Sequence, residues 1–172
     1  NHAVHLCLAR SIARAIVDAH QKLISVELGF SSIDTSHAGL VKNRTREGGP
    51  TNDWLDVMAV RSTVSDKVLA TLAIFSAHAT CEPIDDLTLQ GDYPAVLQRE
   101  LETRLGGTCL FMAGAVGGMG PADTGPPRSA WSERLGCRLA GMIESEVRTQ
   151  MSFAKTGPIA ACGADFPLPA PI

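Results

Sequence analysis

The pattern of apolar positions at the start of the chain predicts a helix followed by a strand. Apolar residues recur every three or four positions over residues 4–22, which is the spacing of one helix face. The members of this stripe are Leu8, Ile12, Ile16, Ala19 and Leu23. Directly afterwards, Val26, Leu28 and Phe30 alternate with polar or small residues, so residues 24–33 are expected to form a half-buried strand.

Further elements follow in an alternating order. Residues 56–61 and 68–76 read as two strands, and the second is so apolar that it is expected to be central and covered on both faces. A helix over residues 94–105 opens at a proline and closes at two glycines. Residues 108–113 form a further buried strand, and residues 129–151 a last helix. The fold class is therefore α/β, with a mixed sheet flanked by helices.

Length and composition narrow the class of protein. A chain of 172 residues with 45% apolar residues suits one domain and excludes disorder throughout. Fifteen basic and eighteen acidic residues argue against a nucleic-acid partner. The sequence contains no run of about 18 consecutive apolar residues, so no transmembrane helix is predicted. The five cysteines are scattered, without a C-x-x-C pair, so they read mostly as small core residues.

The ends of the chain suggest an incomplete domain. The first residue is Asn1 rather than Met, and no signal peptide precedes the first helix, so we expect a processed chain or a fragment. Residues 1–156 are expected to form the partial domain, and residues 157–172 a proline-rich exit segment of the same domain.

Two polar segments carry the main candidates for chemistry. His78 follows a buried strand, at the end of a sheet where ligands gather, and a neutral imidazole there is a metal ligand, a proton carrier or a structural histidine bonded to backbone. Residues 34–53 read as a long loop without regular structure. Arg44 in this loop can stabilise an oxyanion or clamp a carboxylate, or simply be a solvated cation.

Three other features have weaker signals. Asp92 precedes a helix, which it can cap, or it can support a metal ligand. The glycines of residues 114–120 follow G-x-x-G-G-x-G rather than the dinucleotide-binding G-x-G-x-x-G, so they are expected to let the backbone approach a neighbouring loop. The spacing of His2 and His5, and that of Asp85 and Asp86, specifies no activity.

The order of these segments resembles the amino-terminal catalytic domain of the neutral/alkaline non-lysosomal ceramidases. The similarity runs over roughly residues 8–122. Its most specific parts are Phe75-Ser76-Ala77-His78-Ala79-Thr80, which matches F-x-x-H-x-T, and Asn43-Arg44-Thr45, which matches N-R-[ST].

The resemblance implies a zinc-dependent amidase that hydrolyses the N-acyl bond of ceramide to a fatty acid and sphingosine. It implies that His78 is a zinc ligand and that Arg44 polarises or orients the amide. Asn43, Thr80 and Asp92 would support these two residues. The substrate-loop candidates are Gly114 and Gly117. The implied partner is a sphingolipid or another N-acyl substrate, and the implied location is secreted or periplasmic.

The sequence also departs from the family pattern. The family's Thr-His-Thr-His motif and its downstream Glu and Tyr ligands have no match, and residues 117–121 replace the family's Gly-Asp-x-Ser-Pro. One histidine cannot hold zinc, since a catalytic site needs about three protein ligands. We therefore expect an internal piece of a larger enzyme. The alternatives are a catalytically degenerate lipid-binding module and an unrelated α/β domain in which His78 is structural.

Overall fold

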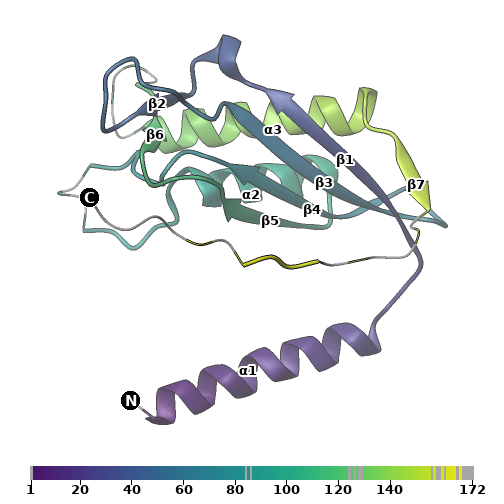
Figure 1. The fold of residues 1–172 in the computed structure, drawn as a ribbon. Coiled ribbons are helices and arrows are strands. Elements are labelled where there is room, and N and C mark those ends of the chain that lie inside the picture. The colour runs from purple at the N-terminus through teal and green to yellow at the C-terminus, as the bar shows by residue number, and fades with distance from the viewer. Residues whose placement is uncertain are drawn as a thin grey trace.

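The chain folds as a mixed β-sheet with two helices packed on one face (Figure 1). The computed structural model describes residues 2–83, 85, 87–123, 125, 127, 130–155, 157, 160, 162–165 and 167. In chain order, its elements are α1 (His2–Gln21), β1 (Val26–Asp34), the 3-10 helix η1 (Ser36–Ala38), β2 (Val41–Asn43), β3 (Trp54–Ser62), β4 (Val68–Phe75), α2 (Asp92–Leu105), β5 (Thr108–Ala113), β6 (Met119–Pro121), α3 (Trp131–Thr149) and β7 (Phe153–Lys155). The predicted α/β class is confirmed.

The main sheet has the strand order β5-β4-β3-β1-β7. Strands β4 and β5 are parallel, and the other neighbours are antiparallel. The connection from β4 to β5 passes through α2, as a parallel pair requires. A separate two-stranded sheet joins β2 to β6.

The core lies between this sheet and the helices α2 and α3. Alternate residues of β3 and β4 point into it, including Leu55, Val57 and Phe75, and α3 adds a stripe of leucine and isoleucine side chains. Burying this apolar surface is the main stabilising term of the fold. Cys81 and Cys109 are buried, as expected of small core residues. The cysteines at positions 7 and 162 are exposed, against that expectation.

The opposite face of the sheet is not covered by a helix among the described residues. Strand β4 is central, as predicted, but the expectation that both its faces are covered is wrong: Leu72 and Ile74 are half-exposed. Phe30 of β1 is also exposed on this side. Helices α2 and α3 both lie on the same side of the sheet, so only that face of β4 is buried. The apolar run of β4 could not show this, because it is apolar on both faces.

The first helix stands apart from the sheet in Figure 1. Residues 3–25, which include nearly all of α1 and the link to β1, are exposed. The helix itself matches the prediction for residues 4–22 closely.

The prediction of a structureless loop over residues 34–53 is wrong in part, because this segment contains η1 and β2. Strand β2 pairs with β6 of the glycine-rich loop, with Val41 opposite Pro121 and Asn43 opposite Met119. Strand β2 has only three residues and its partner β6 is distant in sequence, so no local hydrophobic pattern predicts the pair. Much of the predicted exit segment, residues 157–172, lies outside the described residues, as does Asp86.

Candidate functional site

Three segments far apart in sequence meet beyond the carboxyl end of β4. The backbone N–H of His78 donates to the carbonyl of Met119, at 3.2 Å, and the N–H of Arg44 donates to the carbonyl of Gly118, at 2.8 Å. The predicted zinc ligand and the predicted arginine are therefore attached to adjacent residues of one glycine-rich loop. Both residues are exposed to solvent.

Ser76 fastens this assembly to the sheet. Its Oγ accepts hydrogen bonds from Asn52 Nδ2, at 3.0 Å, and from the N–H of Ala115, at 3.1 Å. The N–H of Gly114 donates to the carbonyl of Phe75, at 3.0 Å. A Cβ at position 114 would collide with Ser76 Oγ, so only glycine fits there.

The prediction that these glycines permit close approach is confirmed at two positions. Gly114 lies against Ser76, and a Cβ at Gly120 would come within 2.7 Å of Cδ of Arg44. Gly117 has no atom within 4 Å of the place of a Cβ, so it does not share this constraint.

A hollow of about 180 Å³ opens beside Arg44. It is lined by Lys42 and Arg44 of the long loop, Thr80 of the segment after His78, and Gly120, Pro121 and Trp131. Two cations and a hydroxyl at its wall suit an anionic or carbonyl oxygen. This hollow is the place where the structure brings the arginine loop and the histidine segment together.

Asn43 shapes the loop that carries Arg44. Its Oδ1 accepts hydrogen bonds from the N–H groups of Thr45 and Arg46, at 3.0 and 2.9 Å, and its Nδ2 donates to the carbonyl of Pro50, at 2.9 Å. Side-chain amides of Asn commonly organise turns in this way. The contacts of Asn43 are thus with the loop backbone, which fits the supporting role expected for it.

Asp92 holds the turn that follows His78. Its Oδ2 accepts hydrogen bonds from the N–H groups of Cys81 and Glu82, at 2.9 and 3.1 Å, and its Oδ1 accepts one from the N–H of Tyr93, at 2.6 Å. Helix α2 begins at Asp92 rather than at Pro94, with Gly91 at the N-cap. Asp92 is therefore not the N-cap residue, but its carboxylate does accept one free N–H of the first turn, that of Tyr93. Asp92 has a positive φ of 51°, a conformation that Asp tolerates better than most residues. On the other side of the turn, Thr80 Oγ donates to the carbonyl of His78, at 3.3 Å.

Tyr93 is a supporting residue that the sequence pattern did not identify. Its hydroxyl donates to the carbonyl of Ala77, directly before His78. Its ring is fully buried and meets Phe75 and Phe111 edge to face, with centroids 6.4 and 5.6 Å away. Burial, followed by the nearby Cys81 and Asp92, raises the pKa of the phenol well above its usual value. Tyr93 is the single tyrosine of the chain and follows Asp92 directly, and this position could have indicated a supporting role.

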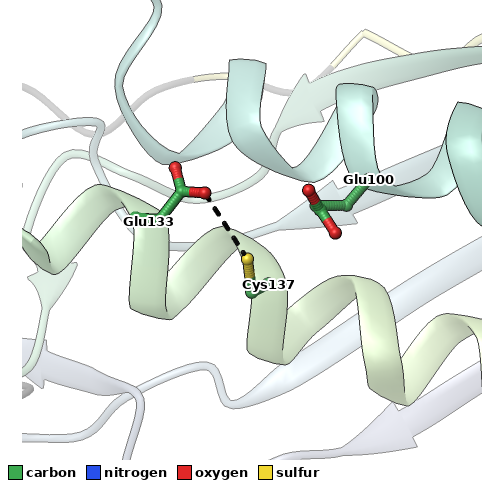
Figure 2. A group of neighbouring side chains, drawn as sticks. All are labelled: Glu100, Glu133 and Cys137. Atoms are coloured by element: carbon green, nitrogen blue, oxygen red, sulfur yellow. Dashed lines mark hydrogen bonds between the residues drawn. The ribbon is translucent and has the colours of Figure 1, made fainter.

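A second cluster of ionisable side chains lies between α2 and α3, away from His78 in sequence. Figure 2 shows Glu100, Glu133 and Cys137 facing one another, and their ligand-capable atoms lie within 4.8 Å of one another. No sequence pattern groups these three residues, because they lie on two helices and have no metal-ligand spacing.

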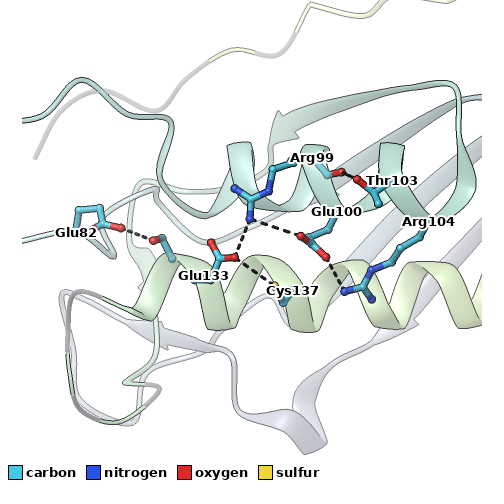
Figure 3. Close-up of polar contacts among 8 residues, drawn as sticks. Glu82, Arg99, Glu100, Thr103, Arg104, Glu133 and Cys137 are labelled. Carbon is cyan, nitrogen blue, oxygen red and sulfur yellow. Dashed lines mark hydrogen bonds and ion pairs between the residues drawn. The ribbon is translucent and has the colours of Figure 1, made fainter.

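The partners of this cluster decide what it does. Figure 3 shows Arg99 reaching both carboxylates, at 2.7 Å from Glu133 and 3.5 Å from Glu100, while Arg104 lies 2.8 Å from Glu100. The hydrogen bond from Arg104 lowers the pKa of Glu100. Burial, with the two carboxylates, raises the pKa of the Cys137 thiol, whereas a metal ligand has to be a thiolate. The cluster fits an interhelical ion-pair network, and a metal would have to displace both guanidinium groups.

Glu82 links the turn after His78 to α3. Its carboxylate accepts a hydrogen bond from the hydroxyl of Ser132 at the start of that helix. Together with Asp92 and Tyr93, this contact attaches the segment after β4 to both helices.

Comparisons with known proteins find similar folds among solved structures, but no match in sequence. No family model matches the chain, and no curated protein matches it in sequence. The neutral ceramidase from Pseudomonas aeruginosa has a similar structure, with a TM-score of 0.66 and 15% identity over 81% of this chain and 25% of its own. A ceramidase complexed with C2 has a TM-score of 0.62 and 13% identity over 73% of this chain and 22% of its own.

Among the described helices, none combines the length and the hydropathy of a membrane-spanning segment. The chain spans about a quarter of the ceramidases whose structures it matches. At these identities, the similarity shows that this chain has a ceramidase-like fold.

Proposed function

We propose that this chain is part of a zinc-dependent amidase that hydrolyses the N-acyl bond of ceramide or a related N-acyl lipid. In this proposal, residues 1–156 are a partial catalytic domain and residues 157–172 its exit segment. The observation that carries it is the attachment of His78 and Arg44 to neighbouring residues of one loop, through Met119 and Gly118. The similarity of the fold to two ceramidases supports the same assignment.

In this arrangement, Arg44 binds the substrate carbonyl. Its guanidinium stays charged and offers several N–H donors, and the hollow that it lines also contains Lys42 and the segment of Thr80. Positive charge placed where an oxyanion develops stabilises the transition state of amide hydrolysis. Asn43, Asp92 and Tyr93 act indirectly, since each holds backbone on which Arg44 or His78 is carried.

His78 fits zinc as one ligand of a larger set. It is an exposed imidazole on a segment whose backbone is fixed on both sides by Tyr93 and Asp92. Among the described residues, the group of three donors that lie close together does not include His78, so this proposal requires further zinc ligands from outside these residues. A zinc ion held in this way would supply an activated water and polarise the amide carbonyl.

Amide hydrolysis by a protein that contains this chain and the remaining ligands tests the proposal, with a fluorescent short-chain ceramide as substrate. His78→Ala is expected to lower kcat/KM by at least about 100-fold and to reduce bound zinc, because a catalytic site needs about three protein ligands. Arg44→Ala is expected to lower kcat by about 10²–10³-fold while bound zinc stays constant.

Two matched variants serve as controls. His37→Ala removes another exposed histidine, on η1, and Arg46→Ala removes another exposed arginine of the same loop. Both are expected to retain activity. Wild-type zinc content and activity in His78→Ala would overturn the proposal and leave His78 as a structural residue. Ceramide binding without hydrolysis in the wild type would instead indicate the degenerate lipid-binding module.

A further inference from the structure

Lys42 is a second cation in the hollow beside Arg44. It precedes Arg44 by two positions on extended backbone, so the two side chains leave the chain on the same face. Val41 takes the opposite face and is 8% exposed, whereas Lys42 and Arg44 are both exposed. Both cations line the hollow of about 180 Å³.

Gly120 brings the two cations closer together. In the pairing of β2 with β6, Gly120 lies opposite Lys42, whereas the N–H of Arg44 bonds to Gly118, two residues earlier. The stem of Arg44 passes over Gly120, because a Cβ there would lie 2.7 Å from Cδ and 3.2 Å from Cγ of Arg44. The side chain of Arg44 therefore bends toward the residue that faces Lys42. Only the missing side chain at position 120 leaves room for this.

Neither cation has an acidic partner in the described part of the chain. The ion pairs among the described residues include neither Lys42 nor Arg44. Glu47 lines an adjoining hollow together with both cations, but forms no ion pair with either of them. Two like charges that line one small space without a carboxylate between them attract an anion to it.

The donors of the hollow narrow the class of anion. Pro121 has no N–H, and the indole N–H of Trp131 and the hydroxyl of Thr80 are each donated to a backbone carbonyl. Lys42 and Arg44 thus supply the side-chain donors that are left for a ligand. Two cationic donors match the two oxygens and the single charge of a carboxylate, whereas a phosphate carries more charge and three acceptor oxygens.

We propose that Lys42 and Arg44 together bind the carboxylate of the fatty acid that amide hydrolysis releases. This inference rests on the proposed amidase function. In the hydrolysis, the oxygen of water bonds to the acyl carbon, the C–N bond breaks, and both protons of the water pass to the amine, giving a carboxylate and an ammonium ion. The amide offers Arg44 one neutral carbonyl oxygen, whereas the product has two oxygens and a full charge. Lys42 therefore contributes mainly after the C–N bond has broken.

The remainder of the catalytic domain is the other source of a counter-charge. The chain spans about a quarter of the ceramidases whose fold it shares, so residues outside it can reach this surface. In the proposed function, however, the space beside the guanidinium of Arg44 stays open, because the substrate carbonyl has to enter it. A fixed carboxylate between Lys42 and Arg44 would neutralise the charge that stabilises the oxyanion. An anion that binds and leaves is therefore favoured.

Binding of butyrate to the 172-residue chain, followed by amide chemical shifts in NMR, tests the site without relying on activity. Saturable shifts are expected at Lys42, Arg44 and Gly120. Lys42→Met is expected to raise the dissociation constant at least about 10-fold, because one of two charge-assisted hydrogen bonds is lost. Butanol, which lacks the charge, and inorganic phosphate are expected to bind more weakly than butyrate. Lys67→Met is the matched control and is expected to bind butyrate like the wild type, since Lys67 is an exposed lysine in the turn between β3 and β4.

Inhibition by a fatty acid tests the role of Lys42 in a longer protein that contains this chain and the remaining zinc ligands. With a neutral short-chain ceramide as substrate, Lys42→Met is expected to raise the inhibition constant of octanoate at least about 10-fold. The KM of the neutral substrate is expected to change by less than about 3-fold, because Lys42 recognises the charge of the product. Lys42→Arg keeps the charge and is expected to restore inhibition by octanoate.

Three results would overturn this inference alone. The first is a wild-type chain that binds no butyrate, or binds phosphate more tightly. The second is butyrate binding that Lys42→Met leaves unchanged, which would place the site elsewhere. The third is octanoate inhibition of the active longer protein that Lys42→Met does not weaken, which would show that the rest of the protein neutralises Lys42. A longer protein without amidase activity would instead refute the proposed function, and the product role of Lys42 with it.

Discussion

Removing one hydroxyl from the core tests whether the segment before His78 is held from below. Tyr93→Phe deletes the donor that bonds the carbonyl of Ala77, and leaves the buried ring between Phe75 and Phe111 unchanged. The carbonyl of Ala77 then loses this partner in a place where water does not easily replace it, since Ala77 is 1% exposed.

The expected loss is about 1–3 kcal/mol, the usual penalty for leaving a buried polar group unpaired. For a chain of this size, 1 kcal/mol corresponds to about 2–4 °C in Tm, so a loss of about 2 kcal/mol lowers Tm by about 4–8 °C. The rings keep their edge-to-face contacts, and the cost is therefore that of the hydrogen bond alone.

Urea unfolding followed by far-ultraviolet circular dichroism measures this loss. Thr103→Val is the matched control: it removes an exposed hydroxyl that donates to the carbonyl of Arg99, at 2.8 Å. Water can satisfy that carbonyl, so its cost is expected to be within about 0.5 kcal/mol. If Tyr93→Phe is as mild as the control, the hydroxyl does not hold Ala77, and the account of how His78 is positioned fails.

Three other predictions concern the same segment. Because Tyr93 is the only tyrosine of the chain, ultraviolet absorbance follows its ionisation alone. Burial raises the pKa of Tyr93 in the folded protein, so its contribution to stability is complete below the ordinary pKa of about 10 and is lost as the pH rises above that value. Titration of Tyr93 near pH 10 in the folded protein would contradict this. Asp92→Asn keeps the size of the side chain but weakens the bonds from Cys81 and Glu82, and is expected to cost about 1–2 kcal/mol in urea unfolding; a change under about 0.3 kcal/mol would rule out this bracing role. Gly114→Ala collides with Ser76 and is expected to cost about 1–3 kcal/mol, whereas Gly117→Ala has free space and is expected to change stability by less than about 0.5 kcal/mol; equal melting temperatures would show that the close approach at position 114 is not needed.

The sequence determined the local elements of this protein. The spacing of Leu8, Ile12 and Ile16 predicts α1 to within about two residues, and the strands around Val57 and Ala73 follow from their apolar runs. These signals are local, since each depends on the 3.6-residue period of a helix or the extended run of a strand. The α/β class followed from the order of the elements, and the candidates His78 and Arg44 from short motifs.

The tertiary structure decided everything that joins distant segments. The pairing of β2 with β6, which brings Arg44 and His78 to one loop, has no local pattern to predict it. The role of Tyr93 depends on a contact between separate elements. The ion pair of Arg99 with Glu133 likewise joins two helices, and Arg104 pairs with Glu100 beside it. Which face of the sheet is buried was also undecided, because an apolar strand looks the same whichever side its helices choose. Local backbone preferences depend on neighbouring residues, whereas these contacts form only when distant segments of the chain come together in the folded state.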